Sequence, residues 1–411
     1  MTTLLSHNIN LLLDHLGRDG ATLQPRVTEP MNPVAELLDT ARLHKEAIVA
    51  TIDRIGSNTV AAIVLDELAF RARLHEVANL DRVHVALSFI HDDHEMKFDL
   101  ATGGGDSDLP LVVVAQELWE SVQALYGPRE MISAATRTVR WPSQDAVRLE
   151  YRRDPALVGW YAPVQRILDV LDRRHTAGLD RLAVLCGTDK WSALHHYTQH
   201  YEHHLSPQRD QMLRILEIGV GGNREAHTGG NSLRMWKHYF PRAIIYGIDI
   251  FDKRGVDEAR LATFRADQSH QDELIEVAQA IGQVDVIIDD GSHLSSHVIA
   301  SFTTLFPYLR DGGLYFIEDL HASLWAPRFN GSGKDTDNPA HSMGFLKRLV
   351  DGLHHQEFLP GDGRSPAPTD RAVRAIHFYR NLAVIEKGAN TDDSPIAEAI
   401  RRGDPPAIYQ D

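Results

Sequence analysis

Two apolar segments of this chain each end in a pair of carboxylates, Val286-Ile-Ile-Asp-Asp290 and Leu314-Tyr-Phe-Ile-Glu-Asp319. Both are typical of buried strands in a parallel sheet, which are near-continuous apolar runs. If the two strands are neighbours, their acids meet at one edge and repel one another unless a cation neutralises them. Mg²⁺ prefers such oxygen ligands. We therefore predict a magnesium site held by Asp290, Glu318 and Asp319, with Asp289 facing the other way; the alternative is a solvated rim of unpaired acids.

A histidine follows the first carboxylate pair at a spacing that returns it to the same edge. Gly291 and Ser292 allow the chain to turn after Asp290, which brings His293 back toward the predicted metal. A neutral imidazole is suited to accept a proton near pH 7 from a hydroxyl beside a cation. We predict that His293 is the general base. A role as metal ligand or helix-cap neighbour is the alternative, and His297 is the weaker competitor.

A glycine-rich turn follows an earlier apolar segment, Leu216-Glu-Ile-Gly-Val-Gly-Gly222. Glycine lets the backbone turn sharply and approach a ligand closely. The spacing is Gly-x-Gly-Gly, and the next helix starts late, so the dinucleotide fingerprint with its helix N-terminus is absent and NAD is disfavoured.

Acidic and amide side chains at the next strand ends suit a nucleoside cofactor. Asp249, which ends Ile244-Ile-Tyr-Gly-Ile-Asp249, is placed to accept hydrogen bonds from a ribose diol. Asp267 and Gln268 are placed to contact an adenine edge. The alternative for Asp249 is a solvent-exposed acid at a strand end, and the alternative for Asp267 and Gln268 is a turn cap.

The elements that must position these residues alternate along the second half of the chain. Strands are predicted near 214–218, 244–249, 263–266, 285–289, 313–317, 375–378 and 382–386, and helices over 231–239, 271–281, 294–308 and 342–355. This alternation indicates an α/β, doubly wound and mostly parallel sheet. The last two strands are joined by a very short turn, which predicts a hairpin with an antiparallel strand at the edge.

Two further segments border the predicted site. Residues 325–341 are rich in Gly, Pro and Asn and follow the fifth strand, so we predict a mobile lid; an ordinary surface loop is the alternative. Residues 194–204 contain several histidines, but no cysteine or carboxylate pattern completes a zinc site. We expect a helix that flanks the cofactor pocket.

The first part of the chain lacks recognisable nucleotide, metal or nucleophile motifs. Residues 1–150 are predicted to form a mainly helical auxiliary or oligomerisation domain, with a helix over 32–44, a strand over 82–90, a flexible loop over 101–108 and a buried helix over 111–125. Residues 151–185 are predicted to form a linking helix, and residues 186–411 the catalytic domain.

Composition limits the class of protein. The chain has 411 residues, a net charge of −15 and one cysteine, Cys186. The acidic charge argues against a nucleic-acid or anionic-membrane partner, and a disulfide-based secreted scaffold is excluded. No signal peptide or membrane span is evident in the sequence. A cytoplasmic location is expected.

Taken together, five motifs resemble the metal- and S-adenosylmethionine (SAM)-dependent sugar O-methyltransferases of macrolide and polyketide biosynthesis. They are Leu216-Glu-Ile-Gly-Val-Gly-Gly222, Gly230-Asn-Ser-Leu-Arg-Met-Trp-Lys237, Tyr246-Gly-Ile-Asp249, Ile288-Asp-Asp-Gly-Ser-His293 and Gly313-Leu-Tyr-Phe-Ile-Glu-Asp319. The resemblance covers Leu216 to about Lys387. It implies a Rossmann-like class I methyltransferase sheet, with SAM and Mg²⁺ as cofactors.

The resemblance also implies residue roles. Mg²⁺ ligands fall on Asp290, Glu318 and Asp319, the catalytic histidine on His293, and cofactor contacts on Thr198, Gly219, Ser232, Asp249, Asp267, Gln268 and Asp290. The long N-terminal extension resembles the 2-O-methylating branch, whereas the shorter, 3-O-methylating branch lacks it. A homo-oligomer, specifically a tetramer, is implied as well.

The predicted function is Mg²⁺-dependent methyl transfer from SAM to a deoxysugar hydroxyl, the 2-hydroxyl, of a glycosylated polyketide antibiotic. One alternative is a catechol-like phenolic acceptor, since a vicinal diol and Mg²⁺ serve there too. A nicotinamide oxidoreductase would need a Gly-x-Gly-x-x-Gly turn, which is absent from this sequence. A non-enzymatic SAM-binding protein would have no need of a base beside a metal.

Overall fold

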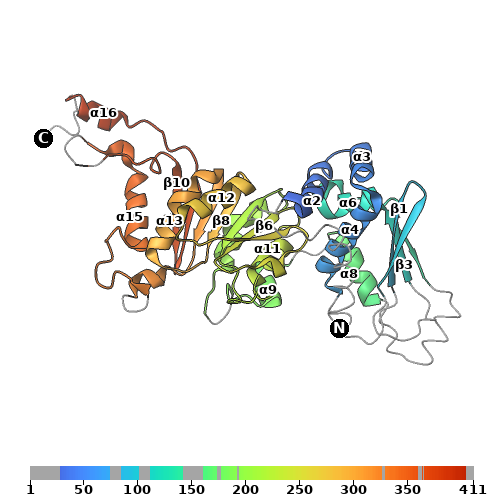
Figure 1. Cartoon of the computed structure of the whole chain (residues 1–411). Coiled ribbons are helices and arrows are strands. Elements are labelled where there is room, and N and C mark those ends of the chain that lie inside the picture. The colour runs from blue at the N-terminus through green and yellow to red at the C-terminus, as the bar shows by residue number, and fades with distance from the viewer. Residues whose placement is uncertain are drawn as a thin grey trace.

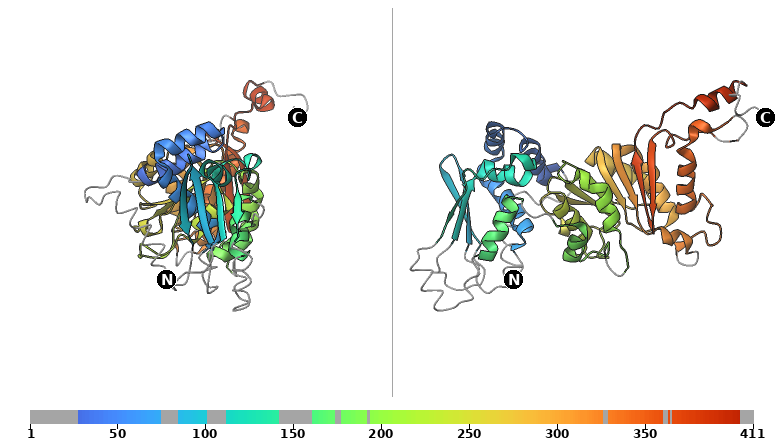
Figure 2. Two further views of the ribbon diagram at one scale, coloured as in Figure 1. Left: turned by 90° about the vertical axis from the view of Figure 1, so that its right-hand side faces the viewer. Right: turned by 180° about the vertical axis from the view of Figure 1, so that it is seen from behind.

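The chain forms two sheet-containing parts that lie side by side (Figure 1). The computed structural model describes residues 28–74, 85–100, 112–141, 161–173, 177–191, 194–325, 329–359, 363 and 365–403. Figure 2 shows the small N-terminal sheet at one end of the molecule and the C-terminal helices at the other. The predicted loop over 101–108 lies outside the described residues.

The larger sheet has seven strands in the order β10-β11-β9-β8-β5-β6-β7. Their bounds are β5 Arg214–Ile218, β6 Ile244–Asp249, β7 Leu261–Arg265, β8 Val284–Asp289, β9 Leu309–Ile317, β10 Val373–Tyr379 and β11 Leu382–Lys387. The neighbouring strands β7 and β6, β6 and β5, β5 and β8, and β8 and β9 all pair in parallel. The α/β, mostly parallel sheet predicted from the alternating pattern is therefore confirmed.

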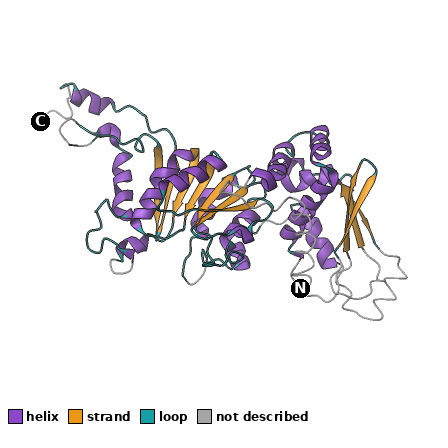
Figure 3. Cartoon of the chain, viewed as in Figure 1, coloured by secondary structure: helices purple, strands orange, loops and turns teal. Residues whose placement is uncertain are grey.

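Helices cover both faces of this sheet, because successive strand residues point to opposite sides. Ile215 packs with α9 (Leu179–Cys186), α10 (Thr198–Leu205) and α11 (Asn231–Tyr239). Its neighbour Leu216 belongs to the core that includes α12 (Gln271–Ile281), α13 (Ser295–Leu305) and α15 (Ser342–Gly352). Figure 3 shows this helix–sheet–helix layering. A last helix, α16, spans Pro395–Arg401.

The C-terminal hairpin is present, but its antiparallel strand is not the outermost one. β11 pairs antiparallel with both β9 and β10, so β11 lies inside the sheet and β10 forms the edge. The reason is that the hairpin inserts its second strand beside β9. The edge strand β10 therefore runs in the same direction as the parallel strands.

The N-terminal part combines helices with a four-stranded sheet of order β2-β1-β3-β4. The strands are β1 Val85–His91, β2 His94–Asp99, β3 Val112–Glu117 and β4 Thr138–Arg140. The helices are α2 Thr28–Thr40, α3 Lys45–Ile55, α4 Ser57–Ala72, α6 Leu118–Tyr126 and α8 Tyr161–Leu171. They lie between the small sheet and the large one (Figure 1).

One local prediction for this part was wrong. The segment predicted as a buried helix over 111–125 is a strand followed by a helix, β3 and α6. Its β-branched start, Val112-Val-Val, pairs in parallel with β1, and such residues favour strands. The predicted linking segment contains two helices: α8 packs on α4 and α6, whereas α9 packs on α11.

A buried ion pair joins the two parts. Glu67 of α4 and Arg260, which precedes β7, have fully buried side chains in direct contact. Next to them, the ring of Phe70 stacks on that of His238, with centroids 3.9 Å apart. The N-terminal helices are therefore fastened to the face of the sheet that carries α11.

Among the described residues, no single helix is long and apolar enough to cross a membrane. The neighbouring helices α3 and α4, bent by 107° at their junction, meet the length and composition criteria only as a pair.

Candidate active site

The carboxyl ends of β8 and β9 bring the predicted acids together. Asp289 is the parallel partner of Ile317, so Asp290 and Glu318 follow side by side. The backbone amide of Glu318 donates to the carbonyl of Asp289 at 3.0 Å, which joins the two strand ends. The edge predicted from the two acidic segments is present.

Three side chains at this edge could hold one cation. Ligand atoms of Asp290, His293 and Asp319 all lie within 4.8 Å of one another. His293 Nε2 lies 3.5 Å from Asp319 Oδ2. Both His293 (φ 58°) and Asp319 (φ 53°) have left-handed backbone conformations. Such conformations are uncommon for residues other than glycine and collect at functional sites.

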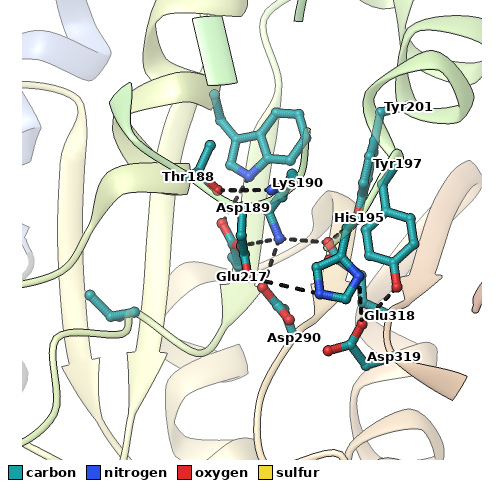
Figure 4. A network of polar contacts seen from close by, with 12 residues as sticks. Thr188, Asp189, Lys190, His195, Tyr197, Tyr201, Glu217, Asp290, Glu318 and Asp319 are labelled. Atoms are coloured by element: carbon teal, nitrogen blue, oxygen red, sulfur yellow. Dashed lines mark hydrogen bonds and ion pairs between the residues drawn. The ribbon is translucent and has the colours of Figure 1, made fainter. Parts of the chain in front are cut away.

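A buried lysine, Lys190, lies beside these acids (Figure 4). Lys190 Nζ donates to Asp290 Oδ2 at 2.7 Å and to Glu318 Oε1 at 2.6 Å. It also lies 3.1 Å from Glu217 Oε1. Burial disfavours its charge, but the three carboxylates outweigh burial and raise the pKa of Lys190 well above its ordinary value. Lys190 is therefore a permanent cation at the base of the site.

Two tyrosines hold the acids of the β9 end. Tyr201 donates to Glu318 Oε1 at 2.5 Å, and Tyr197 donates to Asp319 Oδ1 at 2.6 Å. Burial raises the pKa of Glu318 well above its ordinary value, and the neighbouring Asp290 raises it further. The raised pKa means that the ionised form of Glu318 is disfavoured beside Asp290, and a divalent cation would stabilise that form.

The predicted metal ligands are thus placed differently from one another. Asp290 and Asp319 belong to the cluster that could bind a cation, together with His293. Glu318 is adjacent, but its Oε1 already accepts hydrogen bonds from Lys190 and Tyr201. All three acids nevertheless offer the hard oxygen donors that Mg²⁺ takes.

Asp289 faces the other way, as predicted. Its carboxylate accepts from Gln268 Nε2 at 2.7 Å and from Ser301 Oγ at 2.5 Å. Burial raises the pKa of Asp289 to about 6. The competing base, His297, has its Nδ1 2.9 Å from Ser292 Oγ, whereas His293 points to the acids.

The glycine turn lies against the end of β8. Gly219 has φ 100°, and a Cβ there would lie 2.1 Å from the carbonyl oxygen of Asp290. At Gly222 a Cβ would meet the backbone of Thr228 at 2.2 Å, whereas at Gly221 nothing lies within 4 Å. Gly219 and Gly222 are therefore needed for packing, and the turn is open only at Gly221.

Two of the other predicted cofactor contacts are acids at the ends of neighbouring strands. Asp249, at the end of β6, accepts from the backbone amides of Val220 at 3.1 Å and Phe251 at 2.9 Å. Asp267 follows β7, and its Oδ1 caps a turn by accepting from the amide and hydroxyl of Ser269. These hydrogen bonds lower the pKa of Asp267. Asp249 therefore lies next to the turn, and both acids use part of their oxygen capacity in local hydrogen bonds.

Gln268 is directed elsewhere. It is buried, and besides donating to Asp289 it accepts from the amide of Ser292 at 3.0 Å. A Cβ on Gly291 would lie 2.4 Å from Gln268 Oε1. The side chain therefore supports the turn that leads to His293, and its amide is not free for an adenine edge.

Ser232 and Thr198 lie at helix starts on the α9–α11 face. Both are buried. Ser232 hydrogen-bonds Glu217, whose pKa is raised, first of all by burial. Glu217 also accepts from Trp236 Nε1 at 2.8 Å. The helix α11 is thereby linked to Lys190 and, through it, to the acids.

Five residues at the site were not predicted from the sequence: Lys190, Glu217, Tyr197, Tyr201 and His195, whose Nδ1 lies 3.5 Å from Asp319 Oδ1. A signal existed for Glu217, a charged residue inside the otherwise apolar β5, since a charge in a buried strand requires a partner. For Lys190, which ends the short polar segment Gly187-Thr-Asp-Lys190, the sequence carries no local signal of its partners. Tyr197 and Tyr201 lie at and within α10, 122 and 117 residues from the acids that they contact.

Comparison with known proteins shows the family to which the chain is similar. Residues 34–137 match the family model described as MycE methyltransferase N-terminal. The chain is 43% identical to the 8-demethyl-8-alpha-L-rhamnosyl tetracenomycin-C 2'-O-methyltransferase of Streptomyces olivaceus, over 84% of this chain and 92% of the relative. It is 34% identical to a tetracenomycin-C 3'-O-methyltransferase of the same organism, over 90% and 96%.

A solved structure extends the similarity to the fold. MycE methyltransferase from the mycinamycin pathway, in complex with Mg, SAH and mycinamycin VI, superposes with a TM-score of 0.78 at 31% identity. The match covers 88% of this chain and 94% of that one. Since a 3'-O-methyltransferase also aligns along nearly the whole chain, the long N-terminal part does not by itself indicate the 2-hydroxyl, contrary to expectation. The chain belongs to the family of sugar O-methyltransferases of polyketide antibiotic biosynthesis.

Proposed function

We propose that this chain transfers the methyl group of SAM to the 2-hydroxyl of a deoxysugar on a glycosylated polyketide, with Mg²⁺ in the site. The observation that carries the proposal is the convergence of Asp290, Asp319 and His293 at adjacent strand ends. The relative at 43% identity is named for 2'-O-methylation of a rhamnosyl group, which supports the ring position. The MycE complex with Mg and SAH supports the cofactors.

The cation would be held by Asp290 and Asp319, with Glu318 as the third predicted ligand, and would supply positive charge to two neighbouring sugar oxygens. SAM would supply an electrophilic methyl group beside the turn at Gly219 and the acid Asp249. The roles of Thr198, Ser232 and Asp267 as cofactor contacts are part of the same proposal. Gln268 would act by supporting the turn at Ser292.

The chain's own residues then perform the proton transfer. His293 would accept the proton of the acceptor hydroxyl, and the oxygen would bond to the methyl carbon in line as the methyl–sulfur bond of SAM breaks and SAH is released. Tyr197 keeps Asp319 oriented, and Lys190 neutralises part of the charge of the acids. Much of the rate would come from holding the two reacting atoms together.

The test is methyl transfer from labelled SAM to a panel of glycosylated polyketides and catechols, with Mg²⁺ and with EDTA. Metal-dependent transfer to a sugar hydroxyl, located by NMR at position 2, is expected. Transfer that survives EDTA would remove the essential role of Asp290, Glu318 and Asp319. Transfer to the 3-hydroxyl or to a catechol would refute the proposed acceptor.

A homo-oligomer, specifically a tetramer, is also part of the proposal, and light scattering of the purified chain measures it. A monomer at micromolar concentration would refute it. The cytoplasmic location stays a prediction, supported by the single cysteine.

A further inference from the structure

A row of rings begins at the acids and leads outward. His195 Nδ1 lies 3.5 Å from Asp319 Oδ1. From His195 the ring centroids follow at 6.3 Å to His321, at 4.4 Å from His321 to Trp325 and at 6.0 Å from Trp325 to Phe329. Three of these residues belong to or follow the short helix η6 (Leu320–Leu324), directly after Asp319. The row therefore adjoins the proposed metal site.

The outer end of the row is apolar and open to solvent. Trp325 is 50% exposed, and Leu324 is 42% exposed. Leu194, next to His195, is 74% exposed. Two segments far apart in the sequence thus gather exposed apolar side chains beside a polar site, and such patches mark binding surfaces.

The covalent structure of a glycoside indicates which part of the substrate lies beside the acid cluster. The aglycone is attached at the anomeric carbon, next to the carbon that carries the 2-hydroxyl. When that hydroxyl is at His293 and Asp319, the aglycone begins at the border of the acid cluster. A surface that adjoins the cluster and is apolar is suited to receive it.

We propose that the row His195, His321, Trp325 and Phe329 seats the aglycone and selects a flat, polycyclic aromatic one over a saturated macrolactone. This inference rests on the proposed function. Planar aromatic rings make offset-stacked and edge contacts with other rings in addition to burying apolar surface. A puckered lactone gains only the free energy of burying apolar surface. His321 Nδ1 is buried and has no hydrogen-bond partner within the described part of the chain, which suits a phenol or quinone oxygen on such an aglycone.

The experiment compares three acceptors that carry the same rhamnose: a tetracyclic aromatic glycoside, a macrolactone glycoside and methyl rhamnoside. Wild type is expected to prefer the aromatic glycoside. In Trp325→Leu, the ratio of kcat/KM for the aromatic glycoside to that for methyl rhamnoside should fall about tenfold, the loss typical of a ring that anchors a ligand. Trp325→Phe should retain most of the preference.

Trp141→Leu is the matched control, because Trp141 is a similarly exposed tryptophan (44%) after β4. It should leave the ratio unchanged. A wild type that prefers the macrolactone, or an equal loss for both acceptors in Trp325→Leu, overturns the proposal.

A binding measurement separates this proposal from the proposed function. Calorimetry of the aromatic glycoside with the SAH-loaded protein should show about tenfold weaker binding in Trp325→Leu even if no methyl group is transferred. Absence of transfer to every sugar would refute the proposed function. Unchanged aromatic binding in the variant would refute the ring-row assignment.

Discussion

Replacing Glu67 by Gln should lower the free energy of unfolding, because Glu67 belongs to the buried ion pair that joins the two parts of the chain. The Glu67 carboxylate is fully buried against Arg260 and also accepts from Arg71 Nε at 2.6 Å. Burial alone would raise the pKa of Glu67, but the two guanidinium groups lower it well below its ordinary value. The carboxylate is therefore ionised in the folded protein and offsets buried positive charge.

The magnitude follows from what the neutral amide leaves behind. Removing one partner of a buried ion pair costs about 3–5 kcal/mol, because the remaining charge stays desolvated. Arg260 keeps hydrogen bonds to the carbonyls of Phe240, Ala243 and Lys237, so the lower end, about 3 kcal/mol, is expected.

Urea denaturation of Glu67→Gln and wild type at pH 7 measures this difference. Glu36→Gln is the control: Glu36 pairs with Arg54, whose side chain is 59% exposed, and such surface pairs contribute below about 1 kcal/mol. A cost for Glu67→Gln no larger than that of the control would refute the reasoning.

The Glu67 carboxylate should also make the stability of the protein depend on pH. Its folded pKa is depressed, so its contribution is present above the unfolded value of about 4.3 and is lost as pH falls below it. Wild-type stability should therefore fall more steeply in acid than that of Glu67→Gln. Parallel curves between pH 5 and 3 would contradict the assignment.

Three further predictions concern the site and its surroundings. His293→Ala should retain SAH affinity in calorimetry while turnover falls about 10²–10⁴-fold, the usual contribution of a general base; lost SAH binding would instead place the ring in the cofactor pocket. Gly219→Ala should lower Tm and abolish SAH binding, since its Cβ would lie 2.1 Å from the Asp290 carbonyl oxygen, whereas Gly221→Ala meets no atom within 4 Å and should cost only backbone strain; equal effects would contradict the packing argument. Burial and neighbouring histidines lower the pKa of His204 to about 4, so its neutral ring contributes stability above the unfolded pKa of about 6.5 that is lost as pH falls toward 4; His204→Gln should flatten Tm against pH in that window, and an unchanged slope would refute this.

Local pattern was sufficient for the sheet and for its acidic edge. The strands β5, β6 and β8 and the second half of β9 are mainly apolar runs, followed by or ending in Gly219, Asp249, Asp289 and Glu318. Runs of that kind are typical of strands buried between helices. The carboxyl ends of parallel strands share one edge, so Asp290 and Asp319 had to lie near each other. The direction of Asp289 followed from alternation along the strand.

Contacts between residues far apart in the sequence determined the other features of the site. Lys190 lies 100 residues from Asp290 and 128 from Glu318 in the chain, and no local periodicity encodes such contacts. Gln268 appeared free for a ligand, but the folded chain places Asp289 and Ser292 against it. The segment 112–117 became a strand because β1 offered it a parallel partner. Residue types and strand order thus predict which chemistry is present, whereas the folded chain alone determines which charge neutralises which, because buried charges find partners through space and not along the sequence.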